Sequence, residues 1–170
     1  YELSSGKMNK VIGGNRSFNS LERHPNGSWI TSMTSPQLPS EFYALENNNL
    51  RRLTKVQDDF VAPLSLATVE KFTSKSKDGA TVSSLLYLPA NAGKEKLPVI
   101  FFIHGGPVSQ DEYSFDLTRQ ILAANGYAVV AVNYRGSNGR GIDFSKAIYA
   151  DWGNKEVLDI QGAADNLISK

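Results

Sequence analysis

The alternation of hydrophobic and polar residues changes once along the chain, near Pro63. Before Pro63, short runs with a period of two are separated by Asn, Gly, Ser and Pro, which is typical of antiparallel strands joined by tight turns. The strands expected on this basis are Lys10–Ile12, Phe18–Arg23, Trp29–Thr34 and Glu41–Leu45. The turn Pro25-Asn26-Gly27 predicts a hairpin, because Asn-Gly tolerates positive φ angles. The first part of the chain is therefore predicted to be all-β.

The chain after Pro63 begins with a second predicted hairpin. Val69–Ser74 and Thr81–Leu88 have strand patterns and flank Lys77-Asp78-Gly79, whose Asp-Gly pair favours a two-residue turn. Both strands precede the helical part of the sequence. We therefore expect an antiparallel hairpin at the start of this region.

Strands and helices then alternate. Pro98–Ile103 and Tyr127–Val132 are almost continuous apolar runs, as expected for strands that are covered on both faces. Helical spacing of apolar residues predicts helices at Phe115–Ala124, which Asn125-Gly126 ends, and at Glu156–Ile168. Alternating strands and helices imply right-handed crossovers and a mostly parallel sheet, so the predicted class is α/β.

Composition excludes several classes of function. The 18 Lys and Arg residues nearly balance the 17 Asp and Glu residues, giving a net charge of +1. Because neither sign forms a long run, no nucleic-acid partner is expected. The absence of Cys excludes disulfides and thiolate catalysis. The two histidines, His24 and His104, are far apart in the sequence, so neither a metal site nor a cofactor is expected.

No membrane partner is expected either. The longest apolar runs, such as Leu97–Ile103, are far shorter than the ~20 residues that a membrane-spanning helix needs. Tyr1-Glu2-Leu3 has neither an initiator Met nor the features of a signal peptide, so Tyr1 is not expected to be a natural start. The compartment stays open, cytoplasmic or periplasmic and secreted, because a Cys-free protein tolerates either redox environment.

The strongest chemical signal is His104-Gly105-Gly106-Pro107, which directly follows an apolar strand. Two adjacent glycines let the backbone turn sharply and aim N–H groups into a cavity. Donors of this kind stabilise the oxyanion of a tetrahedral intermediate in acyl transfer. The alternative is a structural turn without chemistry. If φ at Gly106 is negative, alanine there is expected to leave the fold nearly intact and to crowd the oxyanion.

Other marked residues have structural interpretations. Ser137 lies in Gly136-Ser137-Asn138-Gly139, a strong turn composition, and Arg135 stands where the first glycine of a Gly-x-Ser-x-Gly nucleophile elbow would be, so Ser137 is predicted to be a turn residue. Arg135 is expected to anchor its loop through carboxylate or carbonyl groups. Trp152 is expected to pack under the sheet edge, and His24 to be a surface loop residue.

Several motifs occur in order between Val69 and the end of the chain. They are Phe102–Pro107, Ala131–Ser137, Gly139-Arg140-Gly141 with Phe144, and Asp151-Trp152-Gly153 with Asp159. Together they resemble the prolyl oligopeptidase family of serine peptidases, in particular its acylaminoacyl-peptidase and dipeptidyl-peptidase branches. The resemblance implies that residues 63–170 are the N-terminal half of an α/β-hydrolase domain. It also implies that residues 1–62, in which Ser40–Leu45 and Leu50–Thr54 look like the end of a blade, are the C-terminal part of a β-propeller, about one blade.

The resemblance implies a serine peptidase that hydrolyses short peptides in the intact protein. Its oxyanion hole would include His104, Gly105 and Gly106, with the N–H of Gly106 as one donor and the His104 imidazole either donating or orienting the loop. The triad Ser, Asp and His of the family are not found in the 170 residues, so the chain alone is expected to be inactive.

Two alternatives stay open. The first is that the chain is a non-catalytic fragment that acts as a binding or assembly module. The second is that it is part of an esterase or lipase on the same fold, but the β-rich segment before Pro63 argues against this second alternative. Ile100–Ile103 and Val129–Val132, taken as central strands, would need a neighbour from another chain. We therefore expect a complementary C-terminal chain or self-association.

Overall fold

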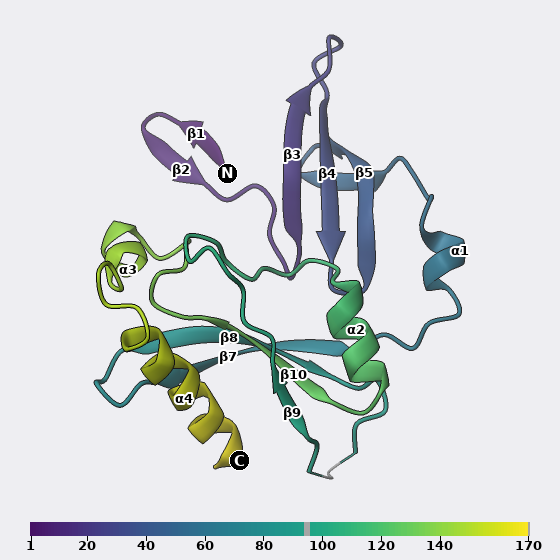
Figure 1. Cartoon of the computed structure of the whole chain (residues 1–170). Coiled ribbons are helices and arrows are strands. Elements are labelled where there is room, and N and C mark those ends of the chain that lie inside the picture. Colours follow the sequence, from purple (N-terminus) through teal and green to yellow (C-terminus); the bar gives the residue numbers. More distant parts are fainter. Residues whose placement is uncertain (94–95, 170) are drawn as a thin grey trace. The chain divides into compact units, whose positions relative to one another are not determined.

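The computed structural model describes residues 1–93 and 96–169 (Figure 1). Their contacts divide the chain into two compact units. Unit 1 consists of Tyr1–Ser65 and Glu112–Asp116, and unit 2 consists of Leu66–Asp111 and Leu117–Lys170. The change of pattern at Pro63 therefore lies close to the first boundary between the units.

Unit 1 contains a four-stranded antiparallel sheet in chain order, β3-β4-β5-β6 (Figure 1). The strands are β3 (Ser17–Arg23), β4 (Trp29–Ser35), β5 (Leu38–Glu46) and β6 (Asn49–Arg52). The three strands predicted between Phe18 and Leu45 are confirmed. The hairpin at Pro25-Asn26-Gly27 is also confirmed, and Gly27 there has φ +89°.

The N-terminal residues of unit 1 form a separate two-stranded ribbon of β1 (Glu2–Ser4) and β2 (Lys7–Asn9). The strand expected at Lys10–Ile12 is wrong. The ladder of β2 ends at Asn9, and the three apolar-rich residues after it connect the ribbon to Gly13-Gly14. A short run of β-forming residues makes a strand only where a neighbouring strand accepts its hydrogen bonds.

A later segment of the chain completes unit 1. The carboxylate of Glu112 accepts a hydrogen bond from the Ser17 hydroxyl at 2.7 Å. The N–H of Phe115 donates to the Thr34 hydroxyl oxygen at 3.0 Å, and the Phe115 ring makes an edge contact with Phe60, 6.4 Å between centroids. Residues 112–116 therefore belong to the packing of the first sheet although they follow it by many residues.

Unit 2 is built on a mixed four-stranded sheet with the order β7-β8-β10-β9. The strands are β7 (Thr68–Lys75), β8 (Thr81–Leu88), β9 (Val99–Phe101) and β10 (Ala128–Asn133). The predicted hairpin β7–β8 is confirmed, with φ +87° at Gly79. Strand β10 pairs with β9 in parallel and with β8 antiparallel.

The expectation of a mostly parallel sheet is therefore wrong for the described residues, in which β9 and β10 are the parallel pair. The hairpin β7–β8 belongs to the same sheet as β9 and β10, because β8 is the neighbour of β10. The architecture is a mixed α/β one, with an antiparallel sheet in unit 1 and a mixed sheet in unit 2.

Strand β10 forms the centre of unit 2. Val129, Val130, Ala131 and Val132 have no exposed surface, so the prediction of a strand covered on both faces is confirmed there. The same prediction is wrong for β9, in which Val99 is 43% exposed. Strand β9 is an edge strand in the described sheet, whereas both neighbours of β10 come from this chain.

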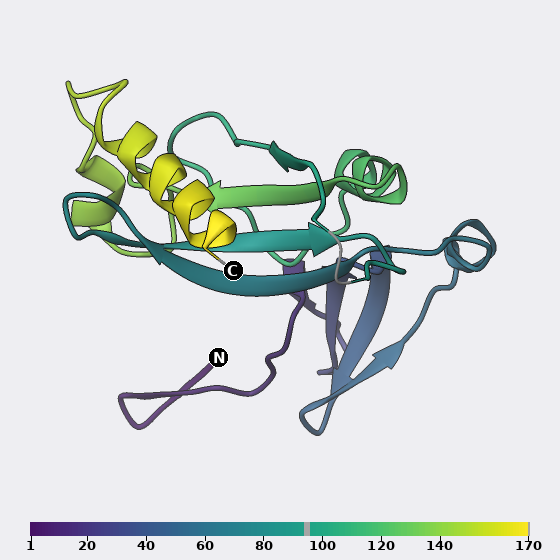
Figure 2. The ribbon, with the colours of Figure 1, turned by 90° about the horizontal axis from the view of Figure 1, so that it is seen from below.

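Three helices accompany this sheet. They are α2 (Leu117–Ala124), α3 (Ile142–Lys146) and α4 (Lys155–Ile168), and the two predicted helices correspond to α2 and α4. Helix α4 contacts β7 and β8, and Figures 1 and 2 show it beside them. Gly162 permits this close approach, because a Cβ atom there would lie 2.5 Å from the carbonyl oxygen of Lys75. None of the described helices is long and apolar enough to cross a membrane.

The buried carboxylate of Glu41 in β5 organises the end of the sheet in unit 1. Its oxygens accept hydrogen bonds from the Thr54 hydroxyl, from the N–H of Gln57 at 2.8 Å and from the Arg52 guanidinium at 3.1 Å. Burial by itself raises the pKa of Glu41, but these donors outweigh it, and the pKa lies below its ordinary value of 4.5. Arg52 also pairs with Asp58 in the short helix α1 (Asp58–Val61).

We expect unit 1 to lose stability in acid through Glu41. A group whose pKa is depressed by folding stabilises the fold above its ordinary pKa, here 4.5, and this contribution is lost as the pH falls through the lower folded value. Glu41→Gln is expected to cost about 3 kcal/mol at neutral pH, because it leaves Arg52 without a buried anion. The same variant is expected to flatten the acid dependence.

The measurement is the urea midpoint of unfolding between about pH 6 and about pH 3, which reports linked protonation. Glu46→Gln is the matched control, since Glu46 lies on the same strand and pairs with Arg51 in solvent. An acid dependence in Glu41→Gln as steep as in the wild type would contradict the assignment.

Candidate active site

The turn that follows β9 presents two glycines to solvent. Gly105 and Gly106 are exposed, and Gly106 has φ +129°. Within residues 1–93 and 96–169, the N–H groups of Gly105 and Gly106 donate no hydrogen bond. Two unpaired N–H groups, carried by exposed glycines after a strand, are what an oxyanion-binding turn requires.

The expectation for alanine at position 106 required a negative φ, and this condition is not met. An alanine there is strained, because an L residue is disfavoured at φ +129° and its Cβ atom would lie 3.1 Å from the backbone nitrogen of Val108. Only glycine takes this conformation without strain. The turn therefore depends on Gly106 for its shape as well as for its N–H.

Tyr134, just after β10, contacts both the side chain and the backbone of His104 in the turn. Its ring is stacked on the His104 imidazole, with 4.6 Å between centroids and 17° between planes. Its hydroxyl donates to the carbonyl oxygen of His104 at 2.8 Å. Burial raises the pKa of the Tyr134 phenol, so the hydroxyl keeps its proton and remains a donor. The backbone and the side chain of His104 are thus held by one residue.

The structure also brings His104 and Ser137 together. Nε2 of His104 lies 2.9 Å from the Ser137 hydroxyl oxygen, and Nδ1 lies 3.1 Å from the carbonyl oxygen of Gly105. Ser137 has no exposed surface. The sequence analysis placed Ser137 in a turn but missed this pair. The available signal was that both residues follow parallel strands, whose carboxyl ends meet at the same edge of a sheet.

The loop after β10 is anchored by a buried ion pair. Arg135 donates to Asp159 through its backbone N–H at 2.7 Å and through Nη2 at 2.8 Å. Asp159, which is fully buried in α4, also accepts from the Ser76 hydroxyl at 2.5 Å. Arg135 pairs with Asp78 at 2.6 Å as well. The prediction that Arg135 anchors its loop is confirmed.

The loop that follows the glycine turn is hydrogen-bonded to the end of β10 and to the loop after it. The N–H of Asp111 donates to the side-chain oxygen of Asn133 at 2.7 Å, and the Asn133 amide donates to the carbonyl of Asp111 at 2.9 Å. The N–H of Asn138 donates to the carbonyl of Ser109 at 2.8 Å. The segments after β9 and β10 are therefore joined at two further points beyond the glycine turn.

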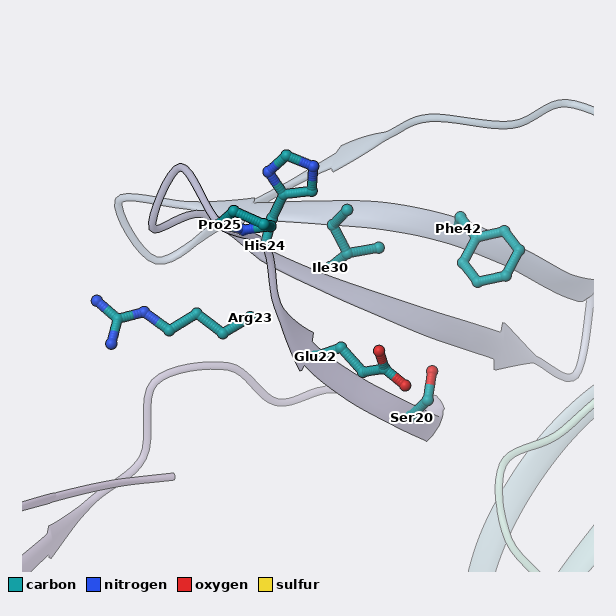
Figure 3. A pocket seen from close by; sticks show the side chains of 7 residues that line it. All are labelled: Ser20, Glu22, Arg23, His24, Pro25, Ile30 and Phe42. Atoms are coloured by element: carbon teal, nitrogen blue, oxygen red, sulfur yellow. The ribbon is translucent and has the colours of Figure 1, made fainter.

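The structure also tests the expectations for His24 and Trp152. His24 is exposed at the β3–β4 turn, as predicted, beside an open pocket of about 320 Å³ in unit 1. Figure 3 shows its imidazole and the carboxylate of Glu22 pointing away from each other. The expectation for Trp152 is wrong, because its side chain is 69% exposed in the connection between α3 and α4. The described residues contain no group of three or more His, Asp or Glu that is placed to hold a metal ion.

The comparisons with known proteins agree with this arrangement. The model of the prolyl oligopeptidase family matches residues 113–170. The uncharacterized peptidase YuxL of Bacillus subtilis (strain 168) is 36% identical over 144 residues, which are 84% of this chain and 22% of the relative. Dipeptidyl aminopeptidase BIII of Pseudoxanthomonas mexicana is 32% identical over 142 residues, which are 78% of this chain and 20% of the relative.

Solved structures give the same result. Acylaminoacyl peptidase of Pyrococcus horikoshii is similar over 98% of this chain, with a TM-score of 0.86 and 26% identity. An acylaminoacyl peptidase in complex with Z-Gly-Gly-Phe-chloromethyl ketone has a TM-score of 0.87 and 26% identity. The chain belongs to the prolyl oligopeptidase family of serine peptidases. It spans about a fifth of the length of the relatives, 22% and 20% for the two named above.

We expect the two carboxylates that hold Arg135 to differ strongly in importance. Asp159→Asn is expected to lower the free energy of unfolding by about 3–5 kcal/mol, because it leaves a buried guanidinium without its charge partner. Asp78→Asn, on the exposed side of the same guanidinium, is expected to change it little. Urea unfolding of both variants makes the comparison, and equal losses would show that Asp159 has no special role.

Proposed function

We propose that the turn 104–106 is the oxyanion-binding element of a serine peptidase that hydrolyses short peptides. The observation that carries this proposal is the pair of unpaired N–H groups of Gly105 and Gly106 at the exit of β9. Membership of a serine peptidase family supports it, as does the naming of relatives as dipeptidyl and acylaminoacyl peptidases. We extend those two activities to the full-length protein as part of the proposal.

The proposed reaction is acyl transfer. A serine hydroxyl attacks the peptide carbonyl, a histidine takes its proton and later gives it to the leaving amine, and an aspartate orients the histidine. The N–H of Gly106 donates to the oxyanion that forms on the carbonyl oxygen. No Gly-x-Ser-x-Gly motif occurs in the 170 residues, so we place the nucleophile elsewhere in the protein.

We assign residues 1–62 to about one blade at the end of a β-propeller and residues 63–170 to the N-terminal half of the hydrolase domain. The four-stranded antiparallel sheet of unit 1 has the strand number of a propeller blade. Apolar side chains are exposed on both of its faces, Phe42 on one and Leu21 and Trp29 on the other. This supports the blade assignment, because blades pack against a neighbour on each face.

The open edge of β9 supports a further strand from a complementary C-terminal segment, or from a second copy of the chain. An unpaired strand edge presents a row of hydrogen-bonding groups that another strand can satisfy. We keep the two other functions as alternatives. A binding or assembly module would need no oxyanion turn, and an esterase or lipase would use the same turn on an ester.

The contact between Ser137 and His104 makes one experiment decisive for this chain. A fluorophosphonate probe labels an activated serine, and Ser137 has a histidine nitrogen 2.9 Å away. We expect no labelling of the isolated chain, because Ser137 is fully buried and leaves no room for an acyl group. The full-length protein is expected to be labelled at one serine outside the 170 residues. Mass spectrometry of the probe adduct locates the site, and labelling of Ser137 would refute the proposal.

We expect Gly106→Ala to lower kcat of the full-length protein on a chromogenic peptide about 100- to 1000-fold, the loss typical for one oxyanion donor. The variant also strains the backbone, so its control must carry the same strain outside the site. Gly126→Ala provides this control, since Gly126 has φ +89° and open space around its Cβ position. Gly126→Ala is expected to lower the thermal midpoint and to keep kcat. Full kcat in Gly106→Ala would make the turn structural.

A further inference from the structure

We propose that helix α2 acts as a clasp that closes an excursion of the chain from unit 2 into unit 1. The excursion is the segment Glu112–Asp116, which packs in unit 1, whereas the residues on both sides of it belong to unit 2. The clasp consists of Arg119 and Gln120, two adjacent buried side chains of α2. This role of α2 is independent of the proposed function. The chain changes unit at three places, which are Ser65–Leu66, Asp111–Glu112 and Asp116–Leu117.

Arg119 joins the two ends of the excursion. Its Nη2 donates to the carboxylate of Asp111 in a buried ion pair, in which the side chains of Arg119 and Asp111 are 5% and 8% exposed. Asp111 is the last residue before the excursion, and α2 begins at Leu117, directly after the excursion. Because Arg119 lies in the first turn of α2, the ion pair holds the beginning of the excursion beside its end.

The surroundings of Arg119 keep its guanidinium in this place. The guanidinium lies over the rings of Phe102 and Tyr87, at 5.0 Å and 5.6 Å from their centroids. Burial by itself lowers the pKa of Arg119, but the hydrogen bond and the charge of Asp111 outweigh it, so the pKa is raised and the side chain stays charged. A buried cation without its carboxylate is strongly disfavoured, so the side chain of Arg119 requires Asp111 at this position.

Asp111 is also fixed from the opposite direction, through its backbone. Its N–H donates to the side-chain oxygen of Asn133 at 2.7 Å, and the Asn133 amide donates to its carbonyl at 2.9 Å. Asn133 is the last residue of β10, the central strand of the sheet in unit 2. The excursion therefore starts from a residue whose backbone is bound to the sheet and whose side chain is bound to α2.

Gln120 holds the first connection between the units. Its side-chain oxygen accepts a hydrogen bond from the N–H of Ala67 at 2.7 Å, and both residues are buried. Ala67 is the second residue of unit 2 after the passage at Ser65–Leu66. Two neighbouring side chains of one helix thus hold the first and the second passage of the chain. The third passage, Asp116–Leu117, is the start of the helix itself.

Closing the excursion matters because ordering a chain segment costs conformational entropy. Hydrogen bonds of Glu112 with Ser17 and of Phe115 with Thr34 attach the excursion in unit 1. When both ends of the excursion are already fixed, fewer conformations are lost, so these bonds form more readily. A buried ion pair is often no more stable than apolar groups of the same size, but it defines one arrangement of the chain. Unit 1 thus depends on Arg119, a side chain that belongs to unit 2.

Amide hydrogen exchange in the full-length protein, read by mass spectrometry, tests the clasp. The reporter is the N–H of Phe115, which donates to the Thr34 hydroxyl oxygen at 3.0 Å. The variant combines Arg119→Met with Asp111→Asn, which removes the ion pair and leaves neither charge buried without a partner. We expect exchange at Phe115 to become about tenfold faster or more, as for the loss of one ordinary hydrogen bond. The amides of β10 are expected to exchange as in the wild type.

Asp159→Asn is the matched control, because it disrupts the other buried ion pair of unit 2 described above, that of Asp159 with Arg135. This pair holds none of the three passages. We expect the control to accelerate exchange in β10 at least as much as at Phe115. An unchanged rate at Phe115 in the double variant, or equal acceleration at Phe115 and in β10, would overturn the clasp.

Gln120→Met is a second variant, which removes the acceptor of the Ala67 N–H without touching a charge. We expect faster exchange at Ala67 and an unchanged rate at Phe115, because each side chain of the clasp holds its own passage. Acceleration of Phe115 to the same degree as Ala67 would show a general loosening of α2, and would contradict the separate roles of Arg119 and Gln120.

Discussion

The parallel pairing of β9 and β10 is the constraint on which the site depends. Two parallel strands leave the sheet at the same edge, so the turn at His104 and the loop at Ser137 meet although they are far apart in the sequence. No single residue in either loop could bring this about. The register of three pairs, which ends at Val130 opposite Phe101, fixes where each loop begins. The exposed glycines and their support then follow from local geometry.

The second requirement is that the loop after β10 keeps its shape without a regular structure of its own. The ion pair Arg135–Asp159 maintains this shape by joining the loop to α4. The hydrogen bond from Ser76 to the same carboxylate joins the β7–β8 turn to them. A buried carboxylate surrounded by donors has few alternative arrangements. A polar contact therefore fixes the conformation of this loop, whereas the burial of apolar side chains fixes the strands.

The sequence predicted the local elements well and the long-range arrangement less well. The run Ala128–Val132 in β10 has no polar residue, and its burial was predictable. The equally apolar run at β9 is partly exposed, because hydrophobicity does not state how many neighbours a strand has in the sheet. For the same reason, the hydrophobic pattern does not predict that β8 pairs with β10 in an antiparallel direction. In the site, the charge of Arg135 indicated an anchor, whereas the contact of His104 with Ser137 required the strand pairing to be known.

The composition of unit 1 has a consequence for the order of synthesis. Its sheet lies within the first 65 residues, but Glu112–Asp116 contribute to its packing through Ser17, Thr34 and Phe60. A chain growing from its N-terminus cannot complete unit 1 until it has also produced β7, β8 and β9 of unit 2. The two units are thus interleaved in time as well as in sequence, and an exchange of the first 65 residues between relatives would separate that sheet from a part of its own packing.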